Sequence, residues 1–175
     1  MLGGSRVRPA LFVLRGDNFC KAKGSKLLCV KPTLEDTLAF ALQKHLGQQD
    51  KAGLPYIFHP IRVMENLGRD AGEDERMAAL LHDVVEDCGV SLDDLRAQGF
   101  PDDVVDAVDL LTKNAEGQDD YRKAIERVAS HPIARRVKIA DLTDNLRLDR
   151  IPHPTEKDRA RLEKYRTAKT FLEAL

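Results

Sequence analysis

The spacing of apolar residues from position 33 to the C-terminus constrains the fold of this 175-residue chain more than any other feature. Apolar side chains recur there every three or four residues, which is the period of an amphipathic helix, and glycine or proline interrupts most runs. These runs predict helices over residues 33–47, 59–68, 73–87, 91–99, 101–111, 119–130, 132–148 and 155–175. Alternating strand patterns are weak, and no Asn-Gly turn occurs. We therefore predict an all-α fold with a single helical bundle.

The N-terminal segment differs in composition from the rest of the chain. Between positions 1 and 26 its basic side chains face a single acidic one, the set being Arg6, Arg8, Arg15, Lys21, Lys23 and Lys26 against Asp17. The apolar run at residues 10–14 is much shorter than the core of a signal peptide. We expect two parts: a basic extension over residues 1–31, flexible or forming a short strand, and a catalytic domain over residues 32–175.

Composition excludes several classes of function. The 28 Lys and Arg residues nearly balance the 29 Asp and Glu residues, so bulk positive charge does not hold this chain to nucleic acid. No segment has the length of apolar sequence that a membrane span needs. Cys20, Cys29 and Cys88 show no CxxC spacing, so neither a disulfide framework nor a zinc finger is indicated. We expect a cytoplasmic protein without a nucleic-acid or membrane partner; a homodimer is compatible with the sequence, although no motif indicates one.

The segment AALLHDVVEDCG, residues 78–89, carries the densest group of chemically active side chains. His82 and Asp83 are followed four residues later by Glu86 and Asp87, and this spacing returns each pair to one helix face. Three carboxylates so close together repel one another, and a nearby core raises the cost further. A divalent cation would compensate the acids and accept a neutral imidazole nitrogen as a ligand. The alternative is a solvated acidic face with one histidine at the edge of the core.

Two further segments add residues of the same kind. In PYIFHPIRV, His59 precedes a proline at the start of a predicted helix. In VKIADLTDNL, Asp141 lies within an apolar stripe and Asn145 follows one turn later. A buried aspartate is costly unless something neutralises it. In isolation, His59 could be an ordinary helix-end histidine, and Asp141 could pair with a surface cation.

The order of these residues, H…HD…D, resembles that of the HD-domain metal-dependent phosphohydrolases. That resemblance implies that the metal ligands are His59, His82, Asp83 and Asp141. The motifs HLGQ, KAGLPYIFHP, LLHDVVEDCG, LLTK and VKIADLTDN are similar to the hydrolase domain of Rel/SpoT proteins and to the small alarmone hydrolases, and the likeness covers roughly residues 34–165. That family is all-helical, binds manganese and removes the 3′-pyrophosphate from guanosine 3′,5′-bisdiphosphate. Its animal members also act on NADPH.

The resemblance also implies roles for the residues around the proposed ligands. Glu86 and Asp87 would be the acid pair that positions and activates the attacking water, and Asn145 would support the substrate. A bound divalent ion lowers the pKa of its water from about 15.7 towards neutrality. Two imidazoles with two carboxylates suit manganese, iron or zinc better than magnesium. We therefore expect in-line attack by metal-activated water on the 3′-pyrophosphate of (p)ppGpp.

Basic and aromatic residues are candidates for substrate binding. The set comprises Lys51, Tyr56, Lys113, Arg122, Lys138, Arg147 and Tyr165, of which Lys51 and Lys113 match family positions. Tyr56 could contact a base or close the core. His45 also matches a family position, with a structural role expected, and Cys88 is expected to be a small buried residue rather than a nucleophile.

One position departs from the family. Asp50 stands where the family has an arginine that packs on the guanine base, so a planar cation is absent from the expected base pocket. Asp50 could instead accept from guanine nitrogens, or select another nucleotide. Three alternatives to alarmone hydrolysis are a phosphohydrolase acting on NADPH or a nucleoside phosphate, a non-catalytic nucleotide-binding HD domain, and a helical protein-interaction module.

Overall fold

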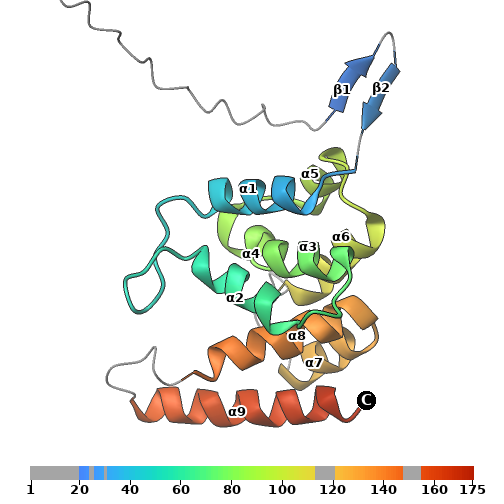
Figure 1. Ribbon diagram of the computed structural model, residues 1–175. Coiled ribbons are helices and arrows are strands. Elements are labelled where there is room, and N and C mark those ends of the chain that lie inside the picture. Colours follow the sequence, from blue (N-terminus) through green and yellow to red (C-terminus); the bar gives the residue numbers. More distant parts are fainter. Residues whose placement is uncertain (1–19, 24–25, 30, 113–120, 148–154) are drawn as a thin grey trace, which may run out of the picture.

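The computed structural model describes residues 20–23, 26–29, 31–112, 121–147 and 155–175. Within them the chain forms a short antiparallel hairpin, β1 (Cys20–Lys23) and β2 (Lys26–Cys29), followed by helices that pack into one body (Figure 1). The helices are α1 (Leu34–Lys44), α2 (Phe58–Asn66), α3 (Glu73–Leu81), α4 (Val84–Cys88), α5 (Leu92–Ala97), α6 (Asp102–Leu111), α7 (Tyr121–Ala129), α8 (Pro132–Asn145) and α9 (Glu156–Glu173). The all-α prediction is confirmed for the described residues from position 31 onward. The strands belong to the predicted extension and lie apart from the helices (Figure 1).

Short local motifs start several of these helices. Thr33, Ser91 and Thr155 each accept a hydrogen bond from the backbone N–H three residues later, and the aspartate there bonds back to the cap. Pro132 occupies the first turn of α8, where its missing N–H costs nothing. These local signals explain why the predicted helix starts agree closely with the structure.

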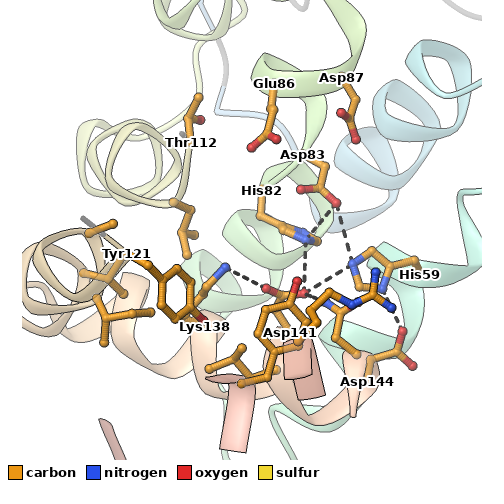
Figure 2. Close-up of a pocket in the computed structure, with 18 of the residues that line it drawn as sticks. His59, His82, Asp83, Glu86, Asp87, Thr112, Tyr121, Lys138, Asp141 and Asp144 are labelled. Atoms are coloured by element: carbon orange, nitrogen blue, oxygen red, sulfur yellow. Dashed lines mark hydrogen bonds and ion pairs between the residues drawn. The ribbon is translucent and has the colours of Figure 1, made fainter. Parts of the chain in front are cut away.

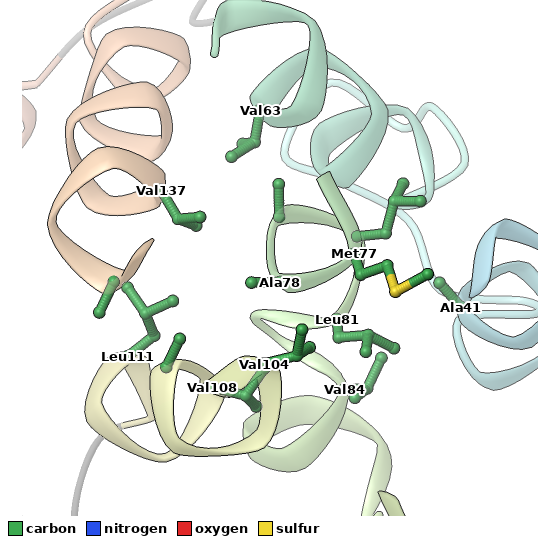
Figure 3. Close-up of a cluster of buried hydrophobic side chains, with 14 of the residues drawn as sticks. Ala41, Val63, Met77, Ala78, Leu81, Val84, Val104, Val108, Leu111 and Val137 are labelled. Carbon is green, nitrogen blue, oxygen red and sulfur yellow. The ribbon is translucent and has the colours of Figure 1, made fainter. Parts of the chain in front are cut away.

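Helix α3 is the centre of the main core. Met77, Ala78, Ala79, Leu80 and Leu81 are all fully buried. Around α3 pack α1, α2, α6 and α8, whose contributions include Val63, Val104, Val108 and Val137 (Figure 3). A smaller apolar cluster of Ile125, Leu142, Ala168 and Leu172 joins α7 and α9 to the other side of α8. Helix α8 therefore lies between two cores, and the C-terminal end of α3 is held rigidly within the bundle.

One helix prediction is wrong. Residues 73–87 were expected to form a continuous helix, but α3 ends at Leu81 and α4 begins at Val84. The imidazole Nδ1 of His82 lies 2.8 Å from the carbonyl oxygen of Ala79, to which it donates. In a continuous helix that carbonyl would accept the N–H of Asp83, so the side chain competes with the backbone at this point. The acid pair Glu86 and Asp87 thus belongs to a separate short helix.

No helix in the described part of the chain combines the length and the apolar character needed to cross a membrane. Residues 1–19, Lys113 and the end of the predicted helix at 132–148 lie outside the described residues.

Candidate active site

A cavity of about 620 Å³ opens beside the C-terminal end of α3. Its lining comes from the loop between α1 and α2, from α4, and from helices α7, α8 and α9. Because these elements are far apart in sequence, only the folded bundle brings their side chains to one place (Figure 2).

The four side chains expected to bind metal converge at the base of this cavity. His59 Nε2 lies 3.4 Å from Asp141 Oδ1 and 3.6 Å from Asp83 Oδ2. His82 Nε2 lies 3.0 Å from Asp83 Oδ2 and 4.0 Å from Asp141 Oδ1. Three of them, His59, His82 and Asp141, are buried and can offer ligand atoms within 4.8 Å of one another. We call these four residues the metal cluster; Figure 2 shows their side chains directed toward one another.

The chemistry of the metal cluster fits a divalent ion. The Nδ1 atom of His82 donates to the Ala79 carbonyl, so in the neutral ring the lone pair of Nε2 points into the cluster. That Nε2 atom is buried and makes no hydrogen bond within the described residues, although the Asp83 carboxylate lies beside it. Two ring nitrogens and two carboxylates directed at one point form a mixed nitrogen and oxygen site of the kind that Mn²⁺, Fe²⁺ and Zn²⁺ accept.

The electrostatics show how strongly these charges depend on one another. Burial lowers the pKa of His59, but its contacts with Asp141 and Asp144 outweigh that effect and raise it to about 9. Burial likewise opposes charge on His82, yet neighbouring Asp83 raises its pKa. Burial favours the neutral form of Asp83 and Asp141, whereas the cations beside them hold both carboxyl pKa values well below the usual range. The raised imidazole pKa values and the lowered carboxyl pKa values show that each kind of side chain favours the charged form of the other.

Three residues expected to bind or orient substrate instead contact the carboxylates of the cluster. Tyr56 donates its hydroxyl to Asp83 Oδ2 at 2.7 Å. Lys138 donates to Asp141 Oδ2 at 2.9 Å, and the Asn145 amide donates to Asp141 Oδ1. Burial and then the charge of Asp83 raise the pKa of Tyr56, so its phenol keeps the proton that it donates. All three line the cavity, so substrate contact and orientation of the carboxylates are compatible roles.

Glu86 and Asp87 both line the cavity from α4, on the side of the cluster opposite Lys138 (Figure 2). Burial raises the pKa of Asp87, and the charges of Asp83 and Glu86 raise it further. A carboxylate with a raised pKa is a better proton acceptor than an ordinary one, as a general base requires.

The pairing of Asp144 with His59 and Arg62 was not predicted from the sequence. Asp144 is fully buried on α8, and its carboxylate contacts both His59 Nδ1 and the guanidinium of Arg62. The sequence did contain a signal for this pairing. Arg62 follows His59 by three residues and Asp144 follows Asp141 by three, so each lies on the same face of its helix as a proposed ligand.

The other residues predicted to bind substrate do not all lie in the cavity. Lys51 and Tyr165 line the cavity, as does Arg147. Arg122 pairs with Glu126 at 3.0 Å on an exposed face and does not line it. Lys113 lies outside the described residues. Sequence reasoning missed three further cations of the lining, so we define the cationic wall as Lys51, Arg127, Arg147, Arg161 and Lys164.

Clear local roles are found for Asp50, which departs from the family pattern, and for His45 and Cys88, which are expected to be structural. The carboxylate of Asp50 accepts the N–H groups of Ala52 and Leu54 at 2.9 and 3.0 Å, which shapes the loop at the cavity rim. His45 is buried and contacts Gln48 and Cys88 at 2.8 and 3.3 Å. Burial raises the pKa of the Cys88 thiol, which disfavours a nucleophilic thiolate.

Comparison with known sequences identifies relatives over most of the chain. A model of the HD domain family matches residues 37–162. A guanosine-3′,5′-bis(diphosphate) 3′-pyrophosphohydrolase of Drosophila melanogaster is 37% identical over 138 residues, which are 74% of this chain and 76% of that protein. The corresponding mouse protein is 38% identical over 135 residues, or 72% of this chain and 74% of the relative.

Longer bacterial proteins match as well. A probable GTP pyrophosphokinase of Mycobacterium leprae is 38% identical over 127 residues, which are 67% of this chain but 16% of that protein. The chain spans 16% to 19% of the length of this and three further bacterial relatives.

The comparison of structures agrees with that of sequences. A solved structure of a metazoan orthologue of SpoT, described as hydrolysing ppGpp with a role in starvation responses, aligns with a TM-score of 0.68 and 31% identity. The alignment covers 82% of this chain and 87% of that one. The extent of these matches shows that the chain belongs to the HD domain family.

Proposed function

We propose that this chain is a metal-dependent phosphohydrolase that removes the 3′-pyrophosphate from guanosine 3′,5′-bisdiphosphate and its pentaphosphate analogue. The convergence of His59, His82, Asp83 and Asp141 at the base of a cavity carries the proposal. Relatives of similar length to this chain bear the name of that activity, which supports the same substrate here.

The four residues of the metal cluster would hold one divalent ion, for which we propose manganese. When bound, such an ion supplies positive charge against the phosphoryl oxygens and lowers the pKa of water. The chain itself orients the two carboxylate ligands through Tyr56, Lys138 and Asn145. These contacts set the carboxylates before substrate arrives, so little reorganisation is needed during reaction.

Glu86 and Asp87 are the proposed acceptors of the proton from the attacking water. Both line the same cavity as the metal cluster, from the short helix α4 that follows Asp83. Burial raises the pKa of Asp87, which makes its carboxylate a better proton acceptor than an ordinary aspartate. Proton transfer to this pair makes the water nucleophilic as it attacks the phosphorus bonded to the ribose 3′ oxygen. The bond between that phosphorus and the 3′ oxygen then breaks, pyrophosphate is released, and the ribose oxygen takes up a proton from solvent.

The opposite side of the cavity would hold the anionic substrate. The cationic wall supplies several positive charges, and Lys138 adds a partly buried one, since Asp141 outweighs burial and raises its pKa. Tyr165 lines the cavity beside Tyr121, with ring centroids 6.4 Å apart, and we propose that it contacts the nucleotide. Lys113 stays a predicted phosphate contact from the family resemblance.

Asp50 gives a specific reason to keep a second substrate class. Its carboxylate structures the loop at the cavity rim, where the related enzymes are expected to offer a cation to the base. A nucleotide with a different base arrangement, such as NADPH or a nucleoside phosphate, is therefore the alternative substrate.

A nucleotide panel tests these proposals directly. The purified chain would be incubated with ppGpp, pppGpp, NADPH and nucleoside monophosphates, with manganese or with a chelator. We expect pyrophosphate from the guanosine bisdiphosphates alone, lost with chelator and restored by manganese. Inorganic phosphate from NADPH or a monophosphate would favour the alternative substrate, and absence of any product would contradict an enzymatic role.

Three coarser predictions accompany this function. We propose a cytoplasmic location, and a catalytic domain over residues 32–175 that is separate from the basic extension over residues 1–31. Lys31, at that boundary, pairs with Glu73 and Asp74 at 3.4 and 2.9 Å, so the extension is expected to attach to the start of α3. Limited proteolysis would test the boundary, and light scattering would test for the homodimer with which the sequence is compatible.

A further inference from the structure

A buried carboxylate that the proposed reaction does not use lies directly behind one of the proposed metal ligands. Asp144 is 0% exposed, and its Oδ2 lies 2.7 Å from Nδ1 of His59. The other ring nitrogen of His59, Nε2, faces Asp141 and Asp83. His59 therefore connects Asp144 to the metal cluster, as Figure 2 shows.

Arg62 balances the charge of Asp144. Its Nε donates to Oδ1 of Asp144 at 2.7 Å, and its terminal nitrogen donates to Oδ2 at 3.2 Å. Both oxygens of this carboxylate thus accept hydrogen bonds, one from the guanidinium alone and one from the guanidinium and the imidazole. A carboxylate removed from water is costly to bury, and this pairing offsets that cost.

The two histidines of the cluster are held in different ways. His82 donates its Nδ1 proton to a backbone carbonyl, that of Ala79, whereas His59 meets a side chain. Metal-binding histidines commonly donate the second ring N–H to a carboxylate or carbonyl, which fixes the tautomer and the ring orientation. Only the contact of His59 can be altered by substituting a side chain.

We propose that Asp144 and Arg62 are positioning residues for the metal site. Asp144 keeps the proton of His59 on Nδ1, which leaves the lone pair of Nε2 directed at the cluster, and Arg62 holds Asp144 in that orientation. This inference rests on the proposed metal site and extends it to two residues outside the four proposed ligands.

The substitution Asp144→Asn separates this role from simple packing. A carboxylate offers two acceptor oxygens, whereas an amide of the same shape offers one acceptor and two N–H donors. We expect the charged guanidinium of Arg62 to keep the single oxygen. The amide nitrogen would then face Nδ1 of His59 and force the ring proton onto Nε2, where it blocks metal binding. In serine proteases the same change in the carboxylate behind the histidine lowers turnover by about 10⁴ through the wrong tautomer.

The first measurement is the manganese dissociation constant of the full chain, from the electron paramagnetic resonance signal of free Mn²⁺. We expect Asp144→Asn to raise it about 10- to 100-fold. The double variant Asp144→Asn with Arg62→Gln should regain much of the affinity, because the glutamine at position 62 accepts from the new amide and returns its oxygen to His59. The control Asp70→Asn removes an exposed carboxylate that also pairs with an arginine, Arg136, at 2.9 Å, and should leave the affinity unchanged.

The second measurement needs no variant. Long-range ¹H–¹⁵N spectra of the zinc-loaded chain report which ring nitrogen of His59 carries the proton, and we expect Nδ1. A proton on Nε2, or an Asp144→Asn variant whose manganese affinity stays within about threefold of the unmodified chain, would overturn the positioning role.

Failure of the unmodified chain to bind manganese or zinc would contradict the proposed metal site rather than this inference. In that case, the same spectra of the metal-free chain at alkaline pH test the positioning role of Asp144, since the neutral ring of His59 should still carry its proton on Nδ1.

Discussion

The two sides of the cavity differ in how the fold holds them. The metal cluster is built from side chains that are 4% to 18% exposed and that come from α2, from the junction of α3 and α4, and from α8. The cationic wall is more open: the side chain of Lys51 is 67% exposed and that of Arg161 is 31% exposed. Lys51 and Arg161 both pair with the same carboxylate, Asp158, at 4.0 and 3.0 Å.

The fold therefore fixes the side chains of the metal cluster, whereas a bound substrate can rearrange those of the cationic wall. Buried charges in the cluster have no alternative partner in water, so helix packing sets their geometry. Ion pairs at the open side contribute at most about 1 kcal/mol each and exchange easily for a phosphate group. We therefore expect substitutions in the cluster to remove activity and substitutions in the wall to change substrate affinity.

The largest effect is expected from Asp83→Ala. The substitution removes a carboxylate that lies near both imidazoles, so the chain should lose its bound metal and nearly all turnover. Metal content after dialysis and the initial rate with ppGpp would be measured together. Asp109→Ala, at an exposed position of α6, is the matched control and should retain both. A metal-loaded and active Asp83→Ala variant would remove Asp83 from the ligand set.

A smaller loss is expected when the acid pair is neutralised. Glu86→Gln and Asp87→Asn remove a proton acceptor without removing a ligand, so each should keep the metal while kcat falls about 10²- to 10⁴-fold. Metal content and kcat separate this result from that of Asp83→Ala. Unchanged turnover in both variants would place the base elsewhere in the cavity.

The pH dependence should distinguish the metal-free cluster from the loaded one. In the folded metal-free chain the pKa of His59 is raised from 6.5 to about 9. Protonation of His59 therefore contributes on the order of 3 kcal/mol to the free energy of unfolding below pH 6.5, and this contribution is lost as pH rises through about 9. Urea unfolding with chelator, at pH 6 and at pH 9.5, would measure it.

The pH dependence of metal affinity should have the opposite sign to that of stability, because the ion must displace the proton from His59. Manganese affinity should rise with pH up to about 9 and then level off. Affinity that does not change between pH 6 and pH 9 would show that His59 is not a ligand.

The smallest effects are expected at the open side. Lys164 lies over the ring of Tyr121 at 3.8 Å, and Lys164→Met should raise KM for ppGpp about three- to tenfold, the loss of one charged contact, with little change in kcat. Lys169→Met, on the same helix but paired with Glu173, is the control. A fall in kcat with unchanged KM would assign Lys164 to the reaction rather than to binding.

The comparison also explains what the sequence could predict. Helix positions followed from apolar periodicity and from local caps such as Thr33 with Asp36, because these signals act within one turn. The four residues expected to bind metal lie together in the structure, since each combines a metal-binding side chain with an apolar context that implies burial. Their role as ligands stays a prediction until metal binding is measured.

Other features depended on contacts between distant segments and were missed. The end of α3 at Leu81 arises from a side-chain contact of His82, which periodicity does not record. Asp144 and Arg62 lie 82 residues apart and each resembles an ordinary surface charge of a helix until the fold joins them. The cations of α9 in the wall were missed for the same reason.

The fully buried segment from Met77 to Leu81 has a consequence for how this protein can evolve. It ends directly at His82, so a change of side-chain volume inside it is expected to displace the imidazole nitrogen proposed as a metal ligand as well as the surrounding hydrocarbon. Mutations there would be selected for catalytic competence and for folding at the same time, and a repacked variant could melt at an unaltered temperature yet have lost its ion.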